Sequence, residues 1–164
     1  MNADATRRLT DIRLPVLDNS GQRTLEEELP AEALEAGRFR LLASPGLVEG
    51  VAAGDELELT SDEPTGFRVL RRGGQLCIWV YLPEPPPVGT EARLDGAARA
   101  LGGYLDGGNT GLRILTVPVT AGFPRVEAEL DAVVVEVGGS SWLYGNVYDW
   151  RNAGRPIGWW EGMV

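Results

Sequence analysis

The side chains that could carry out chemistry are restricted in this chain, because its sequence contains neither lysine nor histidine. All 15 basic residues are therefore arginines, and Cys77 is the single cysteine. Without histidine a Ser-His-Asp or Cys-His centre cannot form, and without lysine neither a Schiff base nor a P-loop lysine is available. One cysteine also cannot supply the ligand set of a zinc site. The sequence therefore favours a non-enzymatic protein with no metal and no cofactor.

Cys77 stands inside the segment 76–82, which is hydrophobic at every position. Such a run is typical of a strand in the middle of a sheet that is covered on both faces. A thiol in that setting behaves as a small hydrophobic group and not as a nucleophile with a lowered pKa. We therefore expect Cys77 to be buried and slow to react.

Arg71 and Arg72 are adjacent at the end of a predicted strand. They could together hold a carboxylate or a phosphate, because the forked guanidinium group suits such anions. The alternative is structural, with either arginine pairing across strands with Glu56 or Glu58. We interpret Asp55, Glu56 and Glu58 as a solvated strand face and not as calcium ligands, because no EF-hand loop surrounds them.

Acidic residues outnumber basic ones by 24 to 15, which gives a net charge of −9 and a pI near 4.5. This charge argues against nucleic acid as a partner, because phosphate binding needs a basic face. A basic protein surface would be attracted, and such complementarity raises association rates. Glu26, Glu27 and Glu28 form an acidic cluster and are candidate contacts for a basic partner. Paired carboxylates could also serve glycoside chemistry, but the sequence singles out no pair.

Aromatic residues gather towards the C-terminus, where Trp142, Tyr144 and Tyr148 are expected to serve the core. The adjacent Trp159 and Trp160 follow a stretch of glycine and proline that breaks regular structure. Two such rings carry a large apolar area, which should be covered. They either pack onto their own domain or anchor a protein partner, and both alternatives stay open.

No apolar run approaches the roughly 20 residues that a membrane-spanning helix needs. Residues 1–10 carry no apolar stretch or cleavage site of a secretory signal, and a single cysteine fits a reducing compartment. We therefore expect a cytoplasmic protein that contacts neither membrane nor nucleic acid. Nothing in the sequence specifies its oligomeric state.

Alternating polar and apolar residues in the first half predict strands joined by turns. The predicted strands are residues 11–17, 38–43, 56–59 and 67–72. Residues 24–33 fit either another strand or an irregular connection. The turn at residues 62–66 should place Glu58 opposite Arg68 on adjacent antiparallel strands.

The second half alternates strands with helices after a stiff proline-rich connector at residues 83–87. A helix capped by Thr90 carries an apolar stripe as far as Leu105 and ends at Gly107-Gly108, and residues 107–111 are interpreted as a loop. The remaining predicted elements are a strand over residues 112–119, a helix over 124–137 and a last strand over 142–150. Three consecutive valines leave a strand as the alternative for the second helix.

The expected architecture is one α+β domain over residues 1–164. Its N-terminal half consists of antiparallel hairpins, and its second half has the order strand-helix-strand-helix-strand. Residues 1–10 are expected to be flexible, and residues 151–164 to form an irregular aromatic tail.

Four short sequences along the chain point to a known family when they are taken together. They are Ile12-Arg13-Leu14-Pro15-Val16, Gly37-Arg38-Phe39-Arg40-Leu41, Gly54-Asp55-Glu56-Leu57-Glu58 and Val69-Leu70-Arg71-Arg72-Gly73-Gly74. In order and spacing they resemble the bacterial family filed as domain of unknown function 4265, over roughly residues 9–150. Family members often carry a Ser-Gly-His type sequence after the paired arginines, where this chain has Gly73-Gly74-Gln75. The resemblance implies a strand-rich N-terminal half and brings no established activity or catalytic residues.

Three hypotheses about function follow. The first is a non-enzymatic bacterial binding protein, most concretely an immunity-type protein that masks a basic toxin. The second is a small-molecule-binding or regulatory domain. The third is a hydrolase that relies on carboxylates or tyrosine alone.

Overall fold

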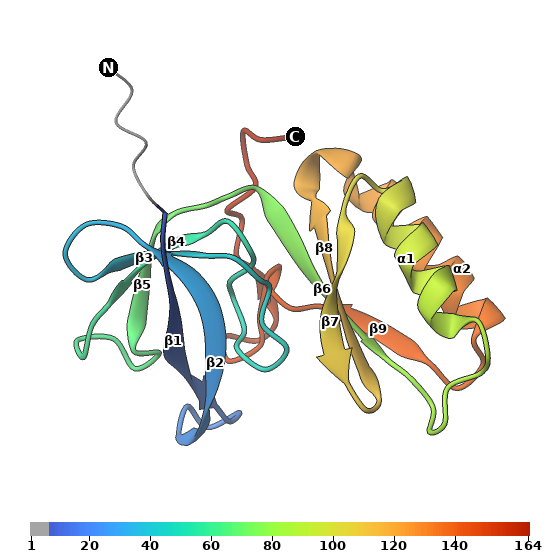
Figure 1. The fold of residues 1–164 in the computed structure, drawn as a ribbon, viewed down its shortest axis with the longest axis horizontal. Coiled ribbons are helices and arrows are strands. Elements are labelled where there is room, and N and C mark those ends of the chain that lie inside the picture. Colours follow the sequence, from blue (N-terminus) through green and yellow to red (C-terminus); the bar gives the residue numbers. More distant parts are fainter. Residues whose placement is uncertain (1–6) are drawn as a thin grey trace.

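The first half of the chain forms a five-stranded antiparallel sheet. The structure, a computed structural model, describes residues 7–164. The strands of this sheet are β1 (Arg8–Leu17), β2 (Arg23–Ala33), β3 (Arg38–Leu41), β4 (Glu56–Leu59) and β5 (Phe67–Arg71). Each pairs with the next in chain order, so the sheet is a simple meander (Figure 1).

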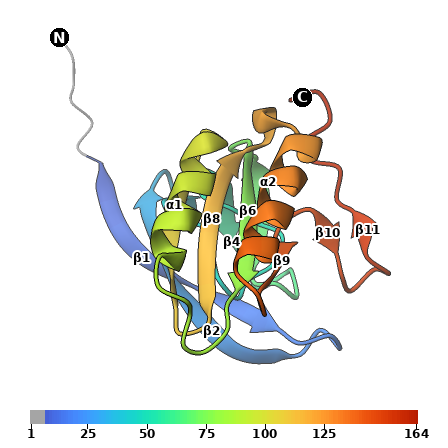
Figure 2. The ribbon, with the colours of Figure 1, turned by 90° about the vertical axis from the view of Figure 1, so that its right-hand side faces the viewer.

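The second half forms a four-stranded antiparallel sheet with the strand order β7-β8-β6-β9. Its elements are β6 (Gln75–Tyr81), α1 (Thr90–Ala100), β7 (Tyr104–Asn109), β8 (Leu112–Pro118), a 3-10 turn (Val119–Ala121), α2 (Phe123–Glu136) and β9 (Ser141–Tyr144). Both helices cover the face that points away from the first sheet (Figures 1 and 2). Among residues 7–164, no helix is long and apolar enough to cross a membrane.

The last part of the chain returns to the junction of the two halves. Residues 145–164, here called the C-terminal arm, contain the short paired strands β10 (Tyr148–Asp149) and β11 (Arg155–Pro156). Figure 1 shows the arm running between the two sheets. The arm is therefore in a position to contact both.

The expected α+β architecture is confirmed, including the strand-rich first half. Residues 24–33, left open between a strand and a connection, belong to β2, which pairs with β1 along its whole length. Glu58 lies opposite Arg68 on β4 and β5, as predicted. Of the residues expected to be flexible, 1–6 lie outside the described residues. Arg8, by contrast, belongs to β1 and is paired with Ala33 of β2.

The predicted end of the first helix is wrong. The helix ends at Ala100, and residues 104–109 form β7, a hairpin partner of β8 that the sequence pattern did not reveal. Gly102 has a φ of 80°, and a Cβ on Gly103 would collide with the carbonyl oxygen of Thr116. The chain can therefore turn sharply and pass close to β8 only because these two positions are glycine.

The predicted strand over residues 142–150 is interrupted after Tyr144. Asn146 is fully buried, and its side-chain amide replaces a strand pairing. The amide oxygen accepts a 2.9 Å hydrogen bond from the backbone N–H of Cys77, and the amide nitrogen donates one of 2.9 Å to the Gln75 carbonyl. The side chain thereby satisfies the β6 backbone while the main chain leaves the sheet to begin the arm.

The central strand β6 is covered on both faces, as the hydrophobic run predicted. Leu76, Ile78 and Val80 pack against the core beneath the helices, whereas Cys77 and Trp79 face the first sheet. The five-stranded sheet has a separate core that includes Val48 and Val51 of the β3–β4 connection. The two halves thus meet along the face of β6 that carries Cys77.

Cys77 is completely buried, and its thiol donates to the carbonyl oxygen of Pro45 at 3.3 Å. Burial raises the pKa of this thiol far above its usual range. Both features suppress the thiolate, which is the reactive form.

We expect Cys77 to react with a thiol reagent at least about 100-fold more slowly in the native protein than in denaturant, because reaction requires opening of the junction. Mass spectrometry of timed samples measures this directly, since no other cysteine competes. Equally fast labelling of the native and unfolded chains would show that this face of β6 is open.

Candidate functional site

The junction of the two sheets is built around residues 42–55, the β3–β4 connection, here called the bridging loop. The indole nitrogen of Trp79 donates to the Pro45 carbonyl at 2.7 Å. The hydroxyls of Ser44 and Thr116 are 2.6 Å apart, and the Ser44 N–H donates to Asp106 at 2.6 Å. The loop is therefore held to β6, β7 and β8 by buried polar contacts.

Glu27 of β2 links the bridging loop to the five-stranded sheet by hydrogen bonds. Its two carboxylate oxygens accept hydrogen bonds of 2.7 to 3.0 Å from the backbone N–H groups of Gly46, Leu47 and Val48. Glu26 and Glu28 point to the opposite, exposed face of β2, as strand alternation requires. The acidic cluster considered as a partner site is therefore divided between a structural carboxylate and two exposed ones.

Asp55 and Arg72 form a buried ion pair beside the bridging loop. Asp55 is 1% exposed and accepts hydrogen bonds from the N–H groups of Ala52 and Gly73 as well as from Arg72 at 3.2 Å. Burial raises the pKa of Asp55 and lowers the pKa of Arg72, so desolvation outweighs the attraction in both shifts. A Cβ on Gly73 would lie 2.5 Å from the Gly54 carbonyl carbon, so this approach needs glycine.

This pair corrects two sequence-based interpretations. Asp55 is not part of a solvated face, and the carboxylate that pairs with Arg72 is neither Glu56 nor Glu58. Glu56 instead accepts from Arg40 at 2.7 Å. Arg71 lies opposite Glu56 in the register, as the cross-strand alternative predicted, but it is exposed, whereas Arg72 is held by the buried Asp55.

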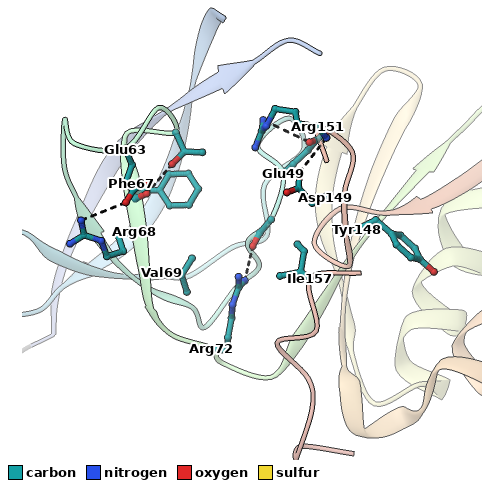
Figure 3. A pocket seen from close by; sticks show the side chains of 12 residues that line it. Glu49, Glu63, Phe67, Arg68, Val69, Arg72, Tyr148, Asp149, Arg151 and Ile157 are labelled. Atoms are coloured by element: carbon teal, nitrogen blue, oxygen red, sulfur yellow. Dashed lines mark hydrogen bonds and ion pairs between the residues drawn. The ribbon is translucent and has the colours of Figure 1, made fainter. Parts of the chain in front are cut away.

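A groove of about 320 Å³ lies between β5 and the C-terminal arm (Figure 3). We call it the inter-sheet groove, and it is lined by Glu49, Gly50, Glu63, Thr65, Phe67, Arg68, Val69, Arg72, Tyr148, Asp149, Arg151 and Ile157. Each of its arginines is tied to a carboxylate: Arg68 to Glu63 at 3.6 Å, Arg72 to Asp55, and Arg151 to Glu49 at 4.0 Å. The groove is thus electrically balanced, which weakens the anion-binding hypothesis for Arg72.

The two tryptophans of the arm pack onto their own chain. The Trp159 indole nitrogen donates to the Asn146 carbonyl at 2.7 Å, and the Arg72 guanidinium lies 5.7 Å from the Trp159 ring centre. Trp160 meets Phe123 edge to face, with 5.2 Å between ring centres. Both rings are half-buried against the core beneath the helices. Of the two alternatives left open by the sequence, the structure therefore shows self-packing.

A second groove, of about 270 Å³, lies where α2, β9 and the beginning of the arm meet. We call it the aromatic-acidic groove, and it is lined by Glu127, Asp131, Trp142, Leu143, Tyr144, Tyr148 and Trp150. Trp142 donates to Asp131 at 2.9 Å, and the Tyr144 hydroxyl to Glu127 at 3.4 Å. The expectation that Trp142, Tyr144 and Tyr148 serve the core is confirmed, because Tyr144 belongs to the core beneath the helices and the other two pack against it. Sequence reasoning overlooked the two carboxylates beside them. The available signal was their i, i+4 spacing on the polar side of the valine stripe of α2.

Comparison with known proteins supports the family resemblance. The family model described as Domain of unknown function (DUF4265) matches residues 27–142. A solved structure, described as a novel crystal structure of a hypothetical protein from Neisseria gonorrhoeae, matches with a TM-score of 0.62. The match covers 85% of this chain and 94% of that one at 13% sequence identity, so the likeness shows the fold alone. None of the curated proteins matches.

The first test concerns the buried ion pair. Changing Asp55→Asn should cost about 3–5 kcal/mol of stability, because Arg72 would keep its charge in a mostly buried position without a partner. Adding Arg72→Met should recover part of that loss, since no unpaired charge remains. Urea unfolding gives both values. Glu28→Gln, which breaks the exposed pair with Arg13, is the control and should cost no more than about 1 kcal/mol; equal costs for both pairs would contradict the assigned role.

The second test concerns the arm. Replacing Trp159 and Trp160 together by alanine should cost several kcal/mol, roughly the range of large-to-small core substitutions, because packing and the Asn146 hydrogen bond are both lost. Trp150→Ala removes an aromatic residue that is 48% exposed and should cost less. Thermal unfolding of the three proteins makes the comparison, and a double variant that melts like the wild type would contradict self-packing.

Proposed function

This chain belongs to the family described as domain of unknown function 4265, and we propose that it acts as a non-enzymatic binding protein for a basic protein partner. In its most specific form, the proposal is an immunity-type protein of the bacterial cytoplasm that neutralises a basic toxin. The observation that carries it is the net charge of −9, together with exposed carboxylates that make no ion pair. Acidic surfaces of this kind steer basic partners and raise association rates.

Ion pairs with carboxylates neutralise about half of the arginines of the chain. The arginines in ion pairs with carboxylates are Arg13, Arg40, Arg68, Arg72, Arg93, Arg99, Arg113 and Arg151. Within residues 7–164, carboxylates such as Glu26, Glu127 and Asp131 have no such pairing. The net charge of −9 favours a basic partner, and exposed carboxylates outside ion pairs are available to contact it.

A small-molecule-binding or regulatory role is the second candidate, and the inter-sheet groove supports it. Its volume of about 320 Å³ falls in the range of ligand sites, and Phe67, Val69 and Ile157 give it an apolar part. A charged ligand would have to displace the existing ion pairs. A neutral or zwitterionic ligand fits this lining better than a phosphate or a carboxylate.

The proposal is tested by affinity capture from the cytoplasm of the organism that encodes the chain. Wild-type protein should retain a basic protein, and the association rate should fall about tenfold or more between low and high salt. A variant with Glu26→Gln, Glu28→Gln, Glu127→Gln and Asp131→Asn should retain it poorly.

The control for this capture is Glu35→Gln with Asp62→Asn, which removes exposed charge elsewhere on the surface. It should retain the partner nearly as well as wild type. Capture of only neutral or acidic proteins, or equal retention by the four-site variant, would count against the proposal.

A further inference from the structure

We propose that the aromatic-acidic groove receives an arginine side chain of the basic partner. That the arginine belongs to a protein partner rests on the function proposed above. The affinity of the groove for a guanidinium group rests on its own geometry. That geometry combines two oriented carboxylates, a series of aromatic rings and a lining without any basic residue.

The two carboxylates are held in place by aromatic donors. Glu127 and Asp131 lie one turn apart on α2, and each uses one oxygen to accept from Tyr144 or Trp142. Their second oxygens make no hydrogen bond with the described residues. Asp131 is therefore oriented by a hydrogen bond of ordinary length and Glu127 by a long, weaker one. Each still has an acceptor free for a guanidinium N–H, which forms strong charge-assisted hydrogen bonds.

The aromatic rings form a series along the groove, in which Tyr144 is only 4% exposed and the accessible rings are those of Trp142, Tyr148 and Trp150. Ring centres are 4.9 Å apart from Trp142 to Tyr144, 6.4 Å from Tyr144 to Tyr148 and 5.4 Å from Tyr148 to Trp150. Trp150, at the exposed end, is 48% accessible. A planar guanidinium stacks on such rings, whereas the strongly hydrated ammonium of lysine gains less from them.

The electrostatic setting distinguishes this groove from the inter-sheet groove. The inter-sheet groove contains three arginines, each already paired, while no cation lines the aromatic-acidic groove. The pKa of Tyr144 is raised, first by burial and then by Glu127, so the site already disfavours further negative charge. An incoming cation therefore meets carboxylates that it does not have to share with an internal arginine.

The test uses the peptide acetyl-Gly-Arg-Gly-amide at millimolar concentration, with its citrulline counterpart as the neutral analogue of the same shape. Nuclear magnetic resonance of the indole N–H groups reports on Trp142 and Trp150 separately. The arginine peptide should shift these two signals to saturation, and the citrulline peptide should leave them unchanged. A lysine peptide should bind more weakly.

Two variants locate the binding. Glu127→Gln with Asp131→Asn should weaken the arginine peptide at least about tenfold, and Trp150→Ala should weaken it too, because carboxylates and ring faces both contribute. The charge-matched control Glu35→Gln with Asp62→Asn should bind like wild type. Circular dichroism confirms that each variant is folded, and Trp150 is exposed enough for its removal to leave the core intact.

Equal shifts by the citrulline peptide, equal or tighter binding of the lysine peptide, or undiminished binding by the groove variants would overturn the inference. These outcomes are separable from failure of the proposed function. A captured basic partner that still binds the Glu127→Gln, Asp131→Asn variant with unchanged affinity refutes the groove inference alone. Specific arginine-peptide binding in the absence of any basic protein partner refutes the partner proposal alone.

Discussion

The structure depends on hydrogen-bond partners for the backbone N–H and carbonyl groups of the bridging loop. This loop has no regular secondary structure and lies between the two sheets. A buried N–H or carbonyl group without a partner costs about as much as a lost hydrogen bond. Here side chains supply the partners: Glu27 accepts from three successive N–H groups, Asp55 accepts from Ala52, and Trp79 donates to the Pro45 carbonyl. No buried side-chain nitrogen or oxygen among the described residues lacks a partner. The loop is therefore hydrogen-bonded to both sheets and connects them.

The same junction determines where the C-terminal arm can lie. Asp55 holds Arg72, whose guanidinium then faces the Trp159 ring, and Asn146 links the start of the arm to β6. Trp159 connects these two sets of contacts, because its indole nitrogen donates a hydrogen bond to the Asn146 carbonyl. The position of Tyr148 between the two grooves, and hence the aromatic series that ends at Trp150, follows from these contacts and not from any property of the arm alone.

Local patterns were sufficient for most of the elements but not for the junction. Alternation revealed β1, β4 and β5, and a wholly hydrophobic run identified β6 as central, because these signals reflect which face of a strand is buried. β7 escaped notice because its glycines suit a loop equally well, and only pairing with β8 makes it a strand. Asp55 looked like the start of an alternating surface strand. Its burial depends on Gly73 and Arg72, far along the chain, and no local pattern encodes such a contact.

The carboxylates of this chain therefore fall into two groups with different physical roles, which the amino-acid composition alone does not distinguish. Carboxylates such as Glu27, Asp55 and Asp106 point inward and replace missing backbone or hydroxyl partners, so their charge is part of the fold. Glu127 and Asp131 point outward, are oriented by aromatic donors and keep free acceptors. The first group must resist change because removing any member leaves buried donors unpaired. Glu127 and Asp131, like the exposed Glu26 and Glu28, can be altered without disturbing the junction, so the proposed recognition of a partner is assigned to carboxylates of this kind.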